Sequence, residues 1–415
     1  MISKIRISKI EIQNYRSCLK TILEPNTNLS TLIGINASGK SNVLSAIMLL
    51  KKLNSSGRFS EYERITTNVS KLKTWFVIGK KTLKHQAIIR YSTDEHNRDE
   101  IYSSQEKWNF KEFTGKNRWI EIPLSFVGYT PNYYLKSGAK ILYRYKREKI
   151  YPFPLKNEYI LEKKYPILNL ISELTSSITY YSASQFTDPS KCPASLEIDE
   201  EGALRQSFFR HNEHARFIYA LYQQYKKSSK VYDQFLSIIG KTGVKLVDSI
   251  KFNEVKVPSR AVEVKTGGKV IKKAKQTLVV IPSFIIGKTK LSPNQLSEGT
   301  FKTLAIVFYL ITDKSKILLL EEPEVCVHHG LLATVMELIK TFSSKKQIII
   351  TTHSDFVLDM LEPENVFIVQ YLKDQGTVVK HIPKSFSKTN YKALKEYLNT
   401  SGNLGEYWRH GGFDK

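Results

Sequence analysis

The stretch Gly34-Ile35-Asn36-Ala37-Ser38-Gly39-Lys40-Ser41 fits the phosphate-binding loop pattern G-x-x-x-x-G-K-S/T and decides the fold. The short, mostly apolar run before it, residues 29–33, is typical of a buried strand. Apolar residues then recur at helical spacing, at Val43, Ala46, Ile47 and Leu50. This order of strand, glycine loop and helix predicts binding of a nucleoside triphosphate. The alternative is a glycine turn before an ordinary helix.

The residue types of this loop suit phosphate chemistry. Glycines at 34 and 39 permit a close backbone approach that a Cβ would block. Lys40 would reach the β- and γ-phosphates, the Ser41 hydroxyl would bind Mg²⁺, and the positive end of the helix favours an anion. We therefore expect the nucleotide to be bound by Gly34, Asn36, Ala37, Ser38, Gly39, Lys40, Ser41 and Asn42.

Length and composition indicate a globular protein. The 415 residues allow two or three domains, and 41% hydrophobic content allows a sizeable core. No run approaches 18 apolar residues, and residues 1–6 lack a secretory hydrophobic region, so we expect a cytoplasmic protein with no membrane partner. Cysteines occur only at positions 18, 192 and 326, and this spacing supports neither a disulfide framework nor a zinc site.

The formal net charge of +24 is the strongest compositional signal. Such an excess favours a polyanionic partner or an acidic protein surface. A Lys- and Asn-rich genome would give the same bias without any function. Charge alone does not choose among these three explanations.

A second part of the predicted site lies near the C-terminal end. Residues 317–324 read Ile-Leu-Leu-Leu-Glu-Glu-Pro-Glu, a buried-strand pattern that ends in acids. Ligands bind at the carboxyl ends of strands in open α/β sheets. There Glu321 would orient the water shell of Mg²⁺, and Glu322 would polarise the attacking water. The alternative is an acidic surface patch after a strand.

Two further motifs flank these acids. Leu296-Ser297-Glu298-Gly299-Thr300 opens a predicted helix, so Ser297 and Gly299 would present a hydroxyl and backbone N–H groups at its N-terminus. Downstream, the strand pattern 348–354 ends near His353, which is a candidate contact for a γ-phosphate. The fixed order of the four motifs favours a single nucleotide site.

In this order the motifs resemble those of the ABC-type ATPase heads of the RecF, SMC and OLD group, over about residues 1–50 and 290–415. The resemblance implies an α/β fold with a mostly parallel sheet, an antiparallel β lobe and a mixed helical insertion. It also implies ATP and Mg²⁺ as cofactors and two heads that meet head to tail, each loop closing on the other's signature segment. Asn14-Tyr15-Arg16-Ser17 is similar to the family's F-R-S motif, which makes Arg16 a candidate nucleotide contact.

Some positions depart from the family pattern. The signature reads L-S-E-G-T instead of L-S-G-G-Q, and the metal residue is Glu321 instead of Asp. His328 stands where the family often has L-H-P, which makes it a further candidate. Gln185 is a candidate for the glutamine-loop residue, and the alternative is an ordinary strand-end glutamine.

The same comparison predicts three parts of the chain. Residues 1–60 and 290–415 would form the ATPase head, and 61–118 an antiparallel β lobe of it, because β-prone stretches between 72 and 110 favour hairpins. An inserted mixed lobe would span 119–289 and is a candidate region for dimerisation or partner binding. Within it we expect a helix at 158–175, helices with an aromatic face in 203–240, and a Lys-rich hairpin around 262–271.

We find no nuclease constellation, and we expect His85, His96, His211 and His214 on solvated faces. OLD nucleases carry a TOPRIM domain after the head, for which about 60 residues past His353 leave no room. The first functional hypothesis is therefore an ATPase subunit of an antiphage defence complex. It would resemble those of the PARIS or Septu systems, with a homo-oligomeric assembly that controls a separate effector nuclease and responds to a nucleic-acid or phage-encoded trigger.

The second hypothesis is a RecF-like, ATP-dependent DNA-binding repair clamp. Aromatic and basic side chains are interleaved at Tyr133, Tyr134, Tyr143, Arg144, Tyr145, Lys146 and Arg147, a combination that suits phosphates and bases. A Lys-rich exposed strand with its tyrosines packed inward explains the same pattern. A transporter ATPase is disfavoured by the N-terminal motif and the long middle insertion.

Overall fold

The computed structural model divides into two compact units. Unit 1 comprises Met1–Tyr181, Lys314–Glu322 and Ile339–Lys415, and unit 2 comprises Ser182–Asp313 and Pro323–Leu338. The three-part division that we expected from the sequence stays a prediction. The structure describes residues 5–53, 69–79, 81–93, 99–112, 120–122, 124–126, 132–137, 140–146, 149–152, 177–198, 212–265, 269–400 and 402–413.

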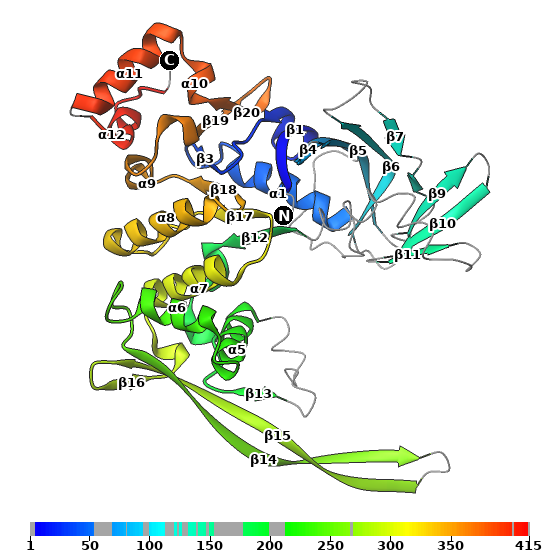
Figure 1. Cartoon of the computed structure of the whole chain (residues 1–415), viewed down its shortest axis with the longest axis vertical. Helices are drawn as coiled ribbons and strands as arrows, with labels where there is room; N and C mark the ends of the chain where they lie inside the picture. Colours follow the sequence, from blue (N-terminus) through cyan, green and yellow to red (C-terminus); the bar gives the residue numbers. More distant parts are fainter. Residues whose placement is uncertain are drawn as a thin grey trace. The chain divides into compact units, whose positions relative to one another are not determined.

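A six-stranded, mostly parallel sheet forms the centre of unit 1, in the order β12-β17-β18-β3-β19-β20 (Figure 1). β17, β18, β3 and β19 are parallel, and β20 closes the edge antiparallel to β19. β3 and β18 are buried along their whole length, as expected for strands covered on both faces. The predicted α/β class is thereby confirmed. The strands are β3 Leu29–Ile33, β12 Ile178–Ser182, β17 Ile317–Glu321, β18 Gln347–Thr352, β19 Val366–Leu372 and β20 Gly376–His381.

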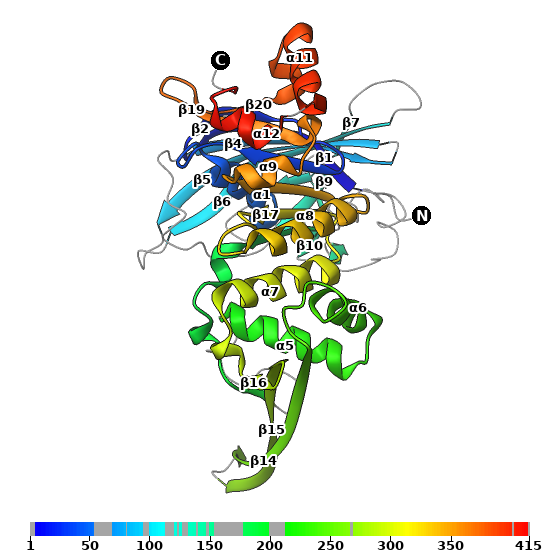
Figure 2. The same cartoon turned by 90° about the vertical axis from the view of Figure 1, so that its left-hand side faces the viewer.

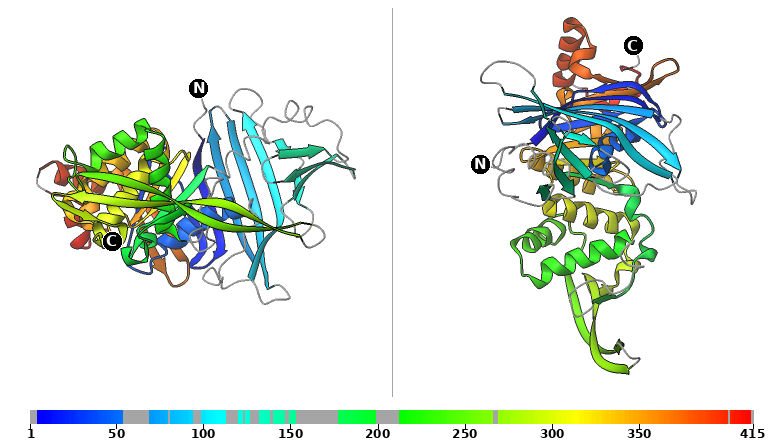
Figure 3. Two further views of the ribbon diagram at one scale, coloured as in Figure 1. Left: turned by 90° about the horizontal axis from the view of Figure 1, so that it is seen from below. Right: turned by 90° about the vertical axis from the view of Figure 1, so that its right-hand side faces the viewer.

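A second six-stranded sheet in unit 1 is antiparallel throughout, in the order β2-β1-β4-β5-β6-β7. Figure 3 shows its strands side by side in dark blue to cyan. The hairpins predicted between 72 and 110 are confirmed. Its strands are β1 Ile5–Tyr15, β2 Cys18–Leu23, β4 Val69–Ile78, β5 Lys81–Thr93, β6 Asp99–Glu112 and β7 Ile120–Ile122.

Helix α1, Lys40–Leu53, supplies apolar side chains to the core that both sheets share. Its predicted core residues Val43, Ala46, Ile47 and Leu50 are at most 2% exposed. Because this helix starts at the end of the glycine loop, its burial fixes the loop against the sheet. Among the described residues, the other helices that lie wholly or partly in unit 1 are α8 His329–Ser343, α9 Asp355–Asp359, η5 Pro363–Asn365, α10 Ile382–Ser385, α11 Lys388–Thr400 and α12 Leu404–Arg409.

One buried amide links the two sheets of unit 1. Gln347, at the start of β18, is fully buried, and its side chain both donates to Ile7 O and accepts from Ile7 N, each at 2.8 Å. Its amide nitrogen also donates to Asn26 O at 2.7 Å. The β1–β4 register shifts between Ile7 and Lys9, so the glutamine satisfies backbone groups at an irregular point of the antiparallel sheet.

A smaller antiparallel sheet has the order β11-β10-β9-β8. The aromatic and basic residues of 133–147 fall largely on β9 and β10, whose backbones pair, but their side chains lie outside the described part. The helix predicted at 158–175 lies outside the described residues altogether. The strands are β8 Leu124–Phe126, β9 Asn132–Ser137, β10 Lys140–Lys146 and β11 Lys149–Pro152.

Unit 2 has an aromatic helical core. Phe186, Phe217, Phe301 and Phe308 are at most 1% exposed, and ring centroids of Phe217 lie 5.4 Å from Phe301 and 5.6 Å from Phe308. The helices predicted within 203–240 are confirmed, while Phe208 and Phe209 lie outside the described residues. The helices of this core are η2 Ala183–Phe186, η3 Pro189–Lys191, α5 Glu213–Lys226, α6 Lys230–Ile239, η4 Pro293–Gln295 and α7 Glu298–Thr312.

A long two-stranded ribbon leaves the helices of unit 2 (Figure 2). β14, Ser249–Lys265, pairs with β15, Lys269–Ile286, from Ser249↔Ile285 to Lys265↔Lys269. β13, Leu196–Ile198, pairs with the middle of β15 at residues 278–280, and β16, Thr289–Leu291, pairs with its C-terminal end at residues 284–286. The predicted hairpin is confirmed, and its arms are longer than we expected from 262–271.

Two histidines that we expected on solvated faces are buried, so that prediction was wrong. His85 is 2% exposed because it falls on the inward-facing alternation of β5. His214 is 6% exposed in the aromatic core of unit 2, where Nε2 contacts Thr187 O at 3.0 Å. His96 and His211 lie outside the described residues. Among the described helices, none has both the length and the apolarity to span a membrane.

Candidate nucleotide-binding site

The glycine loop joins β3 to α1 with the backbone that its glycines allow. Gly39 has φ +101°, and Ala37 also lies in the left-handed region at φ +63°. A Cβ on Gly39 would lie 2.0 Å from Thr377 Oγ1, and one on Gly34 would lie 2.2 Å from Val369 O. Both positions therefore require glycine, because neighbouring atoms lie too close for a Cβ. Position 39 also requires it because its backbone is left-handed.

Lys40 lies across its own loop. The residue is 5% exposed, and Nζ donates to Gly34 O at 2.8 Å and to Ile35 O at 3.1 Å. Ser38 N donates to Ile35 O at 3.2 Å and closes the turn. The ammonium group is thus held at the loop by carbonyl oxygens, close to where the sequence predicts the phosphates.

The start of α1 fits an anion. The first helical bond runs from Val43 N to Gly39 O at 3.1 Å, so the N–H groups of residues 40–42 have no acceptor inside the helix. No acidic residue occupies the first turn. Among the described residues, Ser38 Oγ is a buried hydroxyl without a hydrogen-bond partner. The N–H groups of the first helical turn, the helix dipole and the Lys40 ammonium together suit a phosphate group.

Strand register brings the predicted acids to the same edge of the sheet. Glu321 at the end of β17 pairs with Thr351 of β18, which in turn pairs with Leu32 of β3. The glycine loop begins two residues after Leu32. Glu321 and the loop therefore lie at the carboxyl ends of β17 and β3, two parallel strands on either side of β18, and ligands bind at this edge in open α/β sheets.

Glu322 and His353 face each other at this edge. His353 Nδ1 lies 3.4 Å from Glu322 Oε1, and the two side chains are 43% and 34% exposed. Glu322 has φ +47°, and its N–H donates to Thr351 O at 3.0 Å. The left-handed backbone turns the chain at the strand end. The predicted water-polarising acid and the predicted γ-phosphate contact therefore lie against each other and are both partly exposed to solvent.

Tyr180 of β12 is a residue that the sequence analysis missed. Its hydroxyl donates to Glu321 Oε2, because β12 and β17 are neighbours in the sheet. No local motif in the sequence marked it. Glu321 and the exposed Ser41 supply a carboxylate and a hydroxyl, which are oxygen donors of the kind that Mg²⁺ prefers.

Arg16 lies in the turn between β1 and β2, at φ +50°. Its Nη1 donates to Asn42 Oδ1 at 3.3 Å, and Asn42 Nδ2 donates to Ser17 Oγ at 2.6 Å. The structure therefore brings the predicted arginine to the first turn of α1. It also adds Ser17, which the sequence analysis quoted only as part of the motif.

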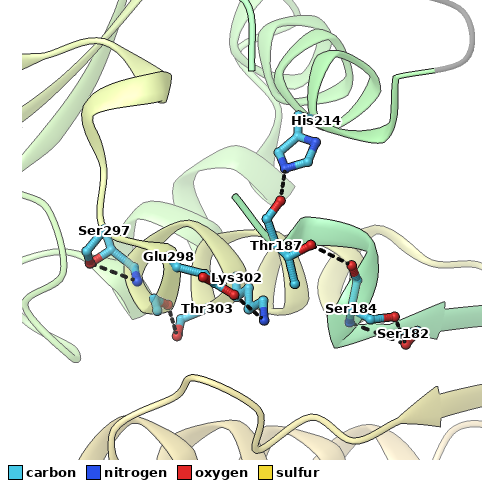
Figure 4. Close-up of polar contacts among 10 residues, drawn as sticks. Ser182, Ser184, Thr187, His214, Ser297, Glu298, Lys302 and Thr303 are labelled. Atoms are coloured by element: carbon cyan, nitrogen blue, oxygen red, sulfur yellow. Dashed lines mark hydrogen bonds and ion pairs between the residues drawn. The ribbon is translucent and has the colours of Figure 1, made fainter. Parts of the chain in front are cut away.

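The signature segment belongs to unit 2. Ser297 is the N-cap of α7, where Oγ accepts from Thr300 N at 3.3 Å (Figure 4). A Cβ on Gly299 would lie 2.4 Å from Cys326 O. Glu298 Oε1 lies 2.8 Å from Nζ of the fully buried Lys302, and this ammonium lowers the pKa of the Glu298 carboxyl. Ser297 and Gly299 are thus built into a helix start, as predicted from the sequence.

The two remaining candidates also lie in unit 2. Gln185 Oε1 accepts from Ser182 N at 3.3 Å and completes a capping box of η2. His328 is exposed, and its Nδ1 accepts from Gly330 N at 3.3 Å. Both side chains make local contacts, and their nucleotide roles stay predictions.

Comparisons with known proteins identify the family. A family model described as AAA ATPase domain matches residues 6–358. No curated protein matches the sequence. Similar solved structures include the SMC head domain from Thermotoga maritima, at 11% identity and TM-score 0.41, covering 91% of this chain and 99% of that chain.

A second similar structure is an Smc head domain with an extended coiled coil, bound to the C-terminal domain of ScpA derived from Pyrococcus furiosus. Its identity is 13% and its TM-score 0.42, with 94% of this chain and 99% of that chain covered. The family model, by contrast, spans most of the sequence and includes the glycine loop and both acids. This chain belongs to the AAA ATPase domain family.

Proposed function

We propose that this protein binds ATP with Mg²⁺ and hydrolyses it at the site in unit 1. The observation that carries the proposal is the meeting of the glycine loop, Glu321 and the Glu322–His353 pair at the carboxyl edge of one parallel sheet. A Gly-rich loop with a lysine holds phosphates, and paired acids beside it serve hydrolysis.

Each side chain has a task in this proposal. Lys40 Nζ moves from the carbonyls of Gly34 and Ile35 to phosphate oxygens, and the N–H groups at the start of α1 donate to the same phosphates. Ser41 and Glu321 would hold Mg²⁺, which would neutralise charge on the phosphates. Glu322 accepts the proton of the attacking water, while His353 contacts both Glu322 and the γ-phosphate.

A second copy of the chain completes the site in this proposal. The exposed Ser297 and the N–H groups at the start of α7 suit the γ-phosphate bound by a partner. The support is the capped helix start and the resemblance of the motif order to ABC-type heads.

Nucleotide titration tests the loop assignment. Lys40→Ala should weaken binding of a fluorescent ATP analogue by at least about 100-fold, or about 2.7 kcal/mol, because it removes the cation at the phosphates. Lys20→Ala is a matched control, since Lys20 is exposed on β2. Equal binding by wild type and Lys40→Ala would refute the assignment.

For the biological role, we propose the regulatory ATPase of a bacterial antiphage complex that controls a separate effector nuclease. The support is the four-motif resemblance to ABC-type heads of that kind. The test is mass spectrometry of proteins that co-purify, in ATP, with tagged Glu322→Gln protein expressed from its native locus. A stoichiometric nuclease or toxin-like partner is the expected result. Its absence from a stable, ATP-bound assembly would count against this role.

The ribbon of unit 2 favours a second candidate, an ATP-dependent DNA-binding clamp. Seven of the 21 residues in 256–276 are Lys or Arg and one is acidic, against 63 Lys and Arg in all 415 residues. This local density exceeds the bias of the whole chain, and a two-stranded ribbon fits the major groove of a duplex. The basic residues are Lys256, Arg260, Lys265, Lys269, Lys272, Lys273 and Lys275.

Duplex binding at low salt tests this candidate. The expected result is an affinity that falls steeply with salt and drops when Lys265, Lys269, Lys272 and Lys273 are all changed to Gln. The control changes four exposed lysines elsewhere to Gln, namely Lys20, Lys373, Lys380 and Lys388. Equal losses in both variants would show that net charge, and not the ribbon, governs binding. No binding at low salt would remove the clamp from consideration.

A further inference from the structure

A β-hairpin near the C-terminal end of the chain contacts the glycine loop. This hairpin is formed by β19 and β20, and its residue Thr377 is fully buried. Thr377 Oγ1 donates to Ser38 O at 3.1 Å and lies 2.7 Å from Ser17 Oγ, while Thr377 N donates to Ser17 O at 2.7 Å. Thr377 and Ser38 lie 339 positions apart in the sequence, and a hydrogen bond joins them at the glycine loop.

Counting protons gives these bonds a direction. A threonine hydroxyl has one proton, and Thr377 gives it to Ser38 O, so Ser17 Oγ must donate to Thr377 Oγ1. Ser17 Oγ in turn accepts from Asn42 Nδ2 at 2.6 Å. Arg16 Nη1 donates to Asn42 Oδ1 at 3.3 Å. One chain of donors thus runs from Arg16 through Asn42, Ser17 and Thr377 to the carbonyl of Ser38.

The end of this chain controls a donor of the loop. The peptide bond between Ser38 and Gly39 is planar and trans, so its C=O and its N–H point in opposite directions. Because Thr377 holds the Ser38 carbonyl towards β20, the Gly39 N–H points away from β20. In the proposed function of the loop, this is the side on which the phosphate is bound.

The close packing around Gly39 agrees with one fixed orientation of the Ser38–Gly39 peptide. A Cβ on Gly39 would meet Thr377 Oγ1 at 2.0 Å, Ser17 Oγ at 2.7 Å and Thr377 Cγ2 at 2.9 Å. Gly376, just before Thr377, has φ +70°, and a Cβ there would lie 2.3 Å from Ser17 O. Both glycines allow the hairpin, the β1–β2 turn and the loop to meet at backbone distance.

We propose that Thr377 is a positioning residue, which orients the Ser38–Gly39 peptide so that its N–H is ready for the triphosphate. This inference rests on the proposed nucleotide function of the loop. Thr377 acts through Ser38 and does not itself touch the nucleotide. The chain of donors also couples this orientation to Arg16.

Two substitutions at one position test the inference. Thr377→Val keeps the shape and removes the hydroxyl, and it should weaken ATP binding by about tenfold, because the Ser38 carbonyl loses its donor. KM should rise with little change in kcat, since the Gly39 N–H serves the ground state and the transition state alike. Thr377→Ser keeps the donor and should bind within about threefold of wild type.

A neighbouring threonine gives a matched control. Thr21 is 1% exposed, and its hydroxyl donates to Thr377 O, so it supports the same hairpin but lies outside the chain of donors. Thr21→Val should lower the melting temperature and leave ATP affinity unchanged. If Thr377→Val lowers stability alone, as Thr21→Val does, the positioning role is wrong.

A third variant keeps the inference testable if Thr377→Val does not fold. Ser17→Ala breaks the chain one step earlier and should also weaken ATP binding, even if Thr377→Val does not fold. Wild-type affinity in folded Ser17→Ala and Thr377→Val proteins would overturn the inference. Failure of the proposed function looks different, because then neither wild type nor Lys40→Ala binds ATP.

Discussion

The glycine loop of unit 1 and the signature segment of unit 2 are held in place by different kinds of contact. Ser38 is bonded by Thr377, and Gly39 packs against Ser17 and Thr377, so segments from both ends of the chain fix the loop. The signature segment depends mainly on its own helix, apart from the close approach of Gly299 to Cys326 O. Its Ser297 caps the turn that reaches Thr300, and Glu298 pairs with a lysine one turn later.

This difference predicts how each region responds to change. A loop fixed by distant segments is sensitive to small errors in packing, because every contact must be kept at once. A helix start fixed by caps and i,i+4 pairs loses stability in small steps. We therefore expect large effects in the loop region and smaller ones in the signature segment.

The largest effect should follow from Glu322→Gln, beside the loop. The amide cannot accept the proton of the attacking water, so turnover should fall by about 100- to 10,000-fold while ATP binding is kept. Steady-state phosphate release and ATP titration measure the two quantities, and size-exclusion chromatography should show a trapped dimer. Undiminished turnover would place the water-activating group elsewhere.

Gly39→Ala should abolish nucleotide binding and destabilise unit 1 by about 3 kcal/mol or more, because a left-handed backbone and a 2.0 Å clash add together. Gly287→Ala is the matched control. Gly287 has φ +60° but no atom within 4 Å of the added Cβ, so only the backbone cost of about 1 kcal/mol remains. Thermal melts and ATP titration compare them. Similar losses of stability in the two variants would mean that the left-handed backbone alone, without close packing, explains the need for glycine at position 39.

Ser297→Ala and Ser297→Arg separate stability from assembly in unit 2. Loss of the cap should cost about 1 kcal/mol in the alanine variant. The arginine variant should in addition block ATP-dependent dimerisation, because a long side chain would occupy the proposed head-to-tail contact. Nucleotide binding by the monomer should be unchanged in both. Parallel loss of binding and dimerisation would contradict the division of tasks between the two regions.

The smallest effect should come from acid titration of Glu298. Lys302 lowers the pKa of this carboxyl in the folded protein, so its stabilising contribution is present above the unfolded pKa of about 4.3 and is lost as pH falls through the lower folded pKa. Solvent screening at the partly exposed carboxyl keeps the effect small. The melting temperatures of wild type and Glu298→Gln should differ at pH 7 and converge below about pH 4. A gap that does not change with pH would show that the pair does not titrate in this way.

The sequence by itself determined the elements and their order. Strand 29–33, the helix with Val43 and Leu50 on its core face, and the cap at Ser297 were predicted, because hydrophobic periodicity and capping are properties of neighbouring residues. It also determined the candidate residues at the sheet edge. Parallel strands that end in acids, a histidine and a glycine loop have their carboxyl ends on one side.

Only the tertiary structure decided which side chains support those elements. Thr377 bonds to Ser38, Gln347 bridges the two sheets and Tyr180 reaches Glu321, yet none of the three leaves a local signal in the sequence. The burial of His85 and His214 was likewise predicted wrongly, because burial depends on what packs against a residue. Hydrogen bonds between residues hundreds of positions apart depend on the complete fold, since only the fold brings their donors and acceptors together.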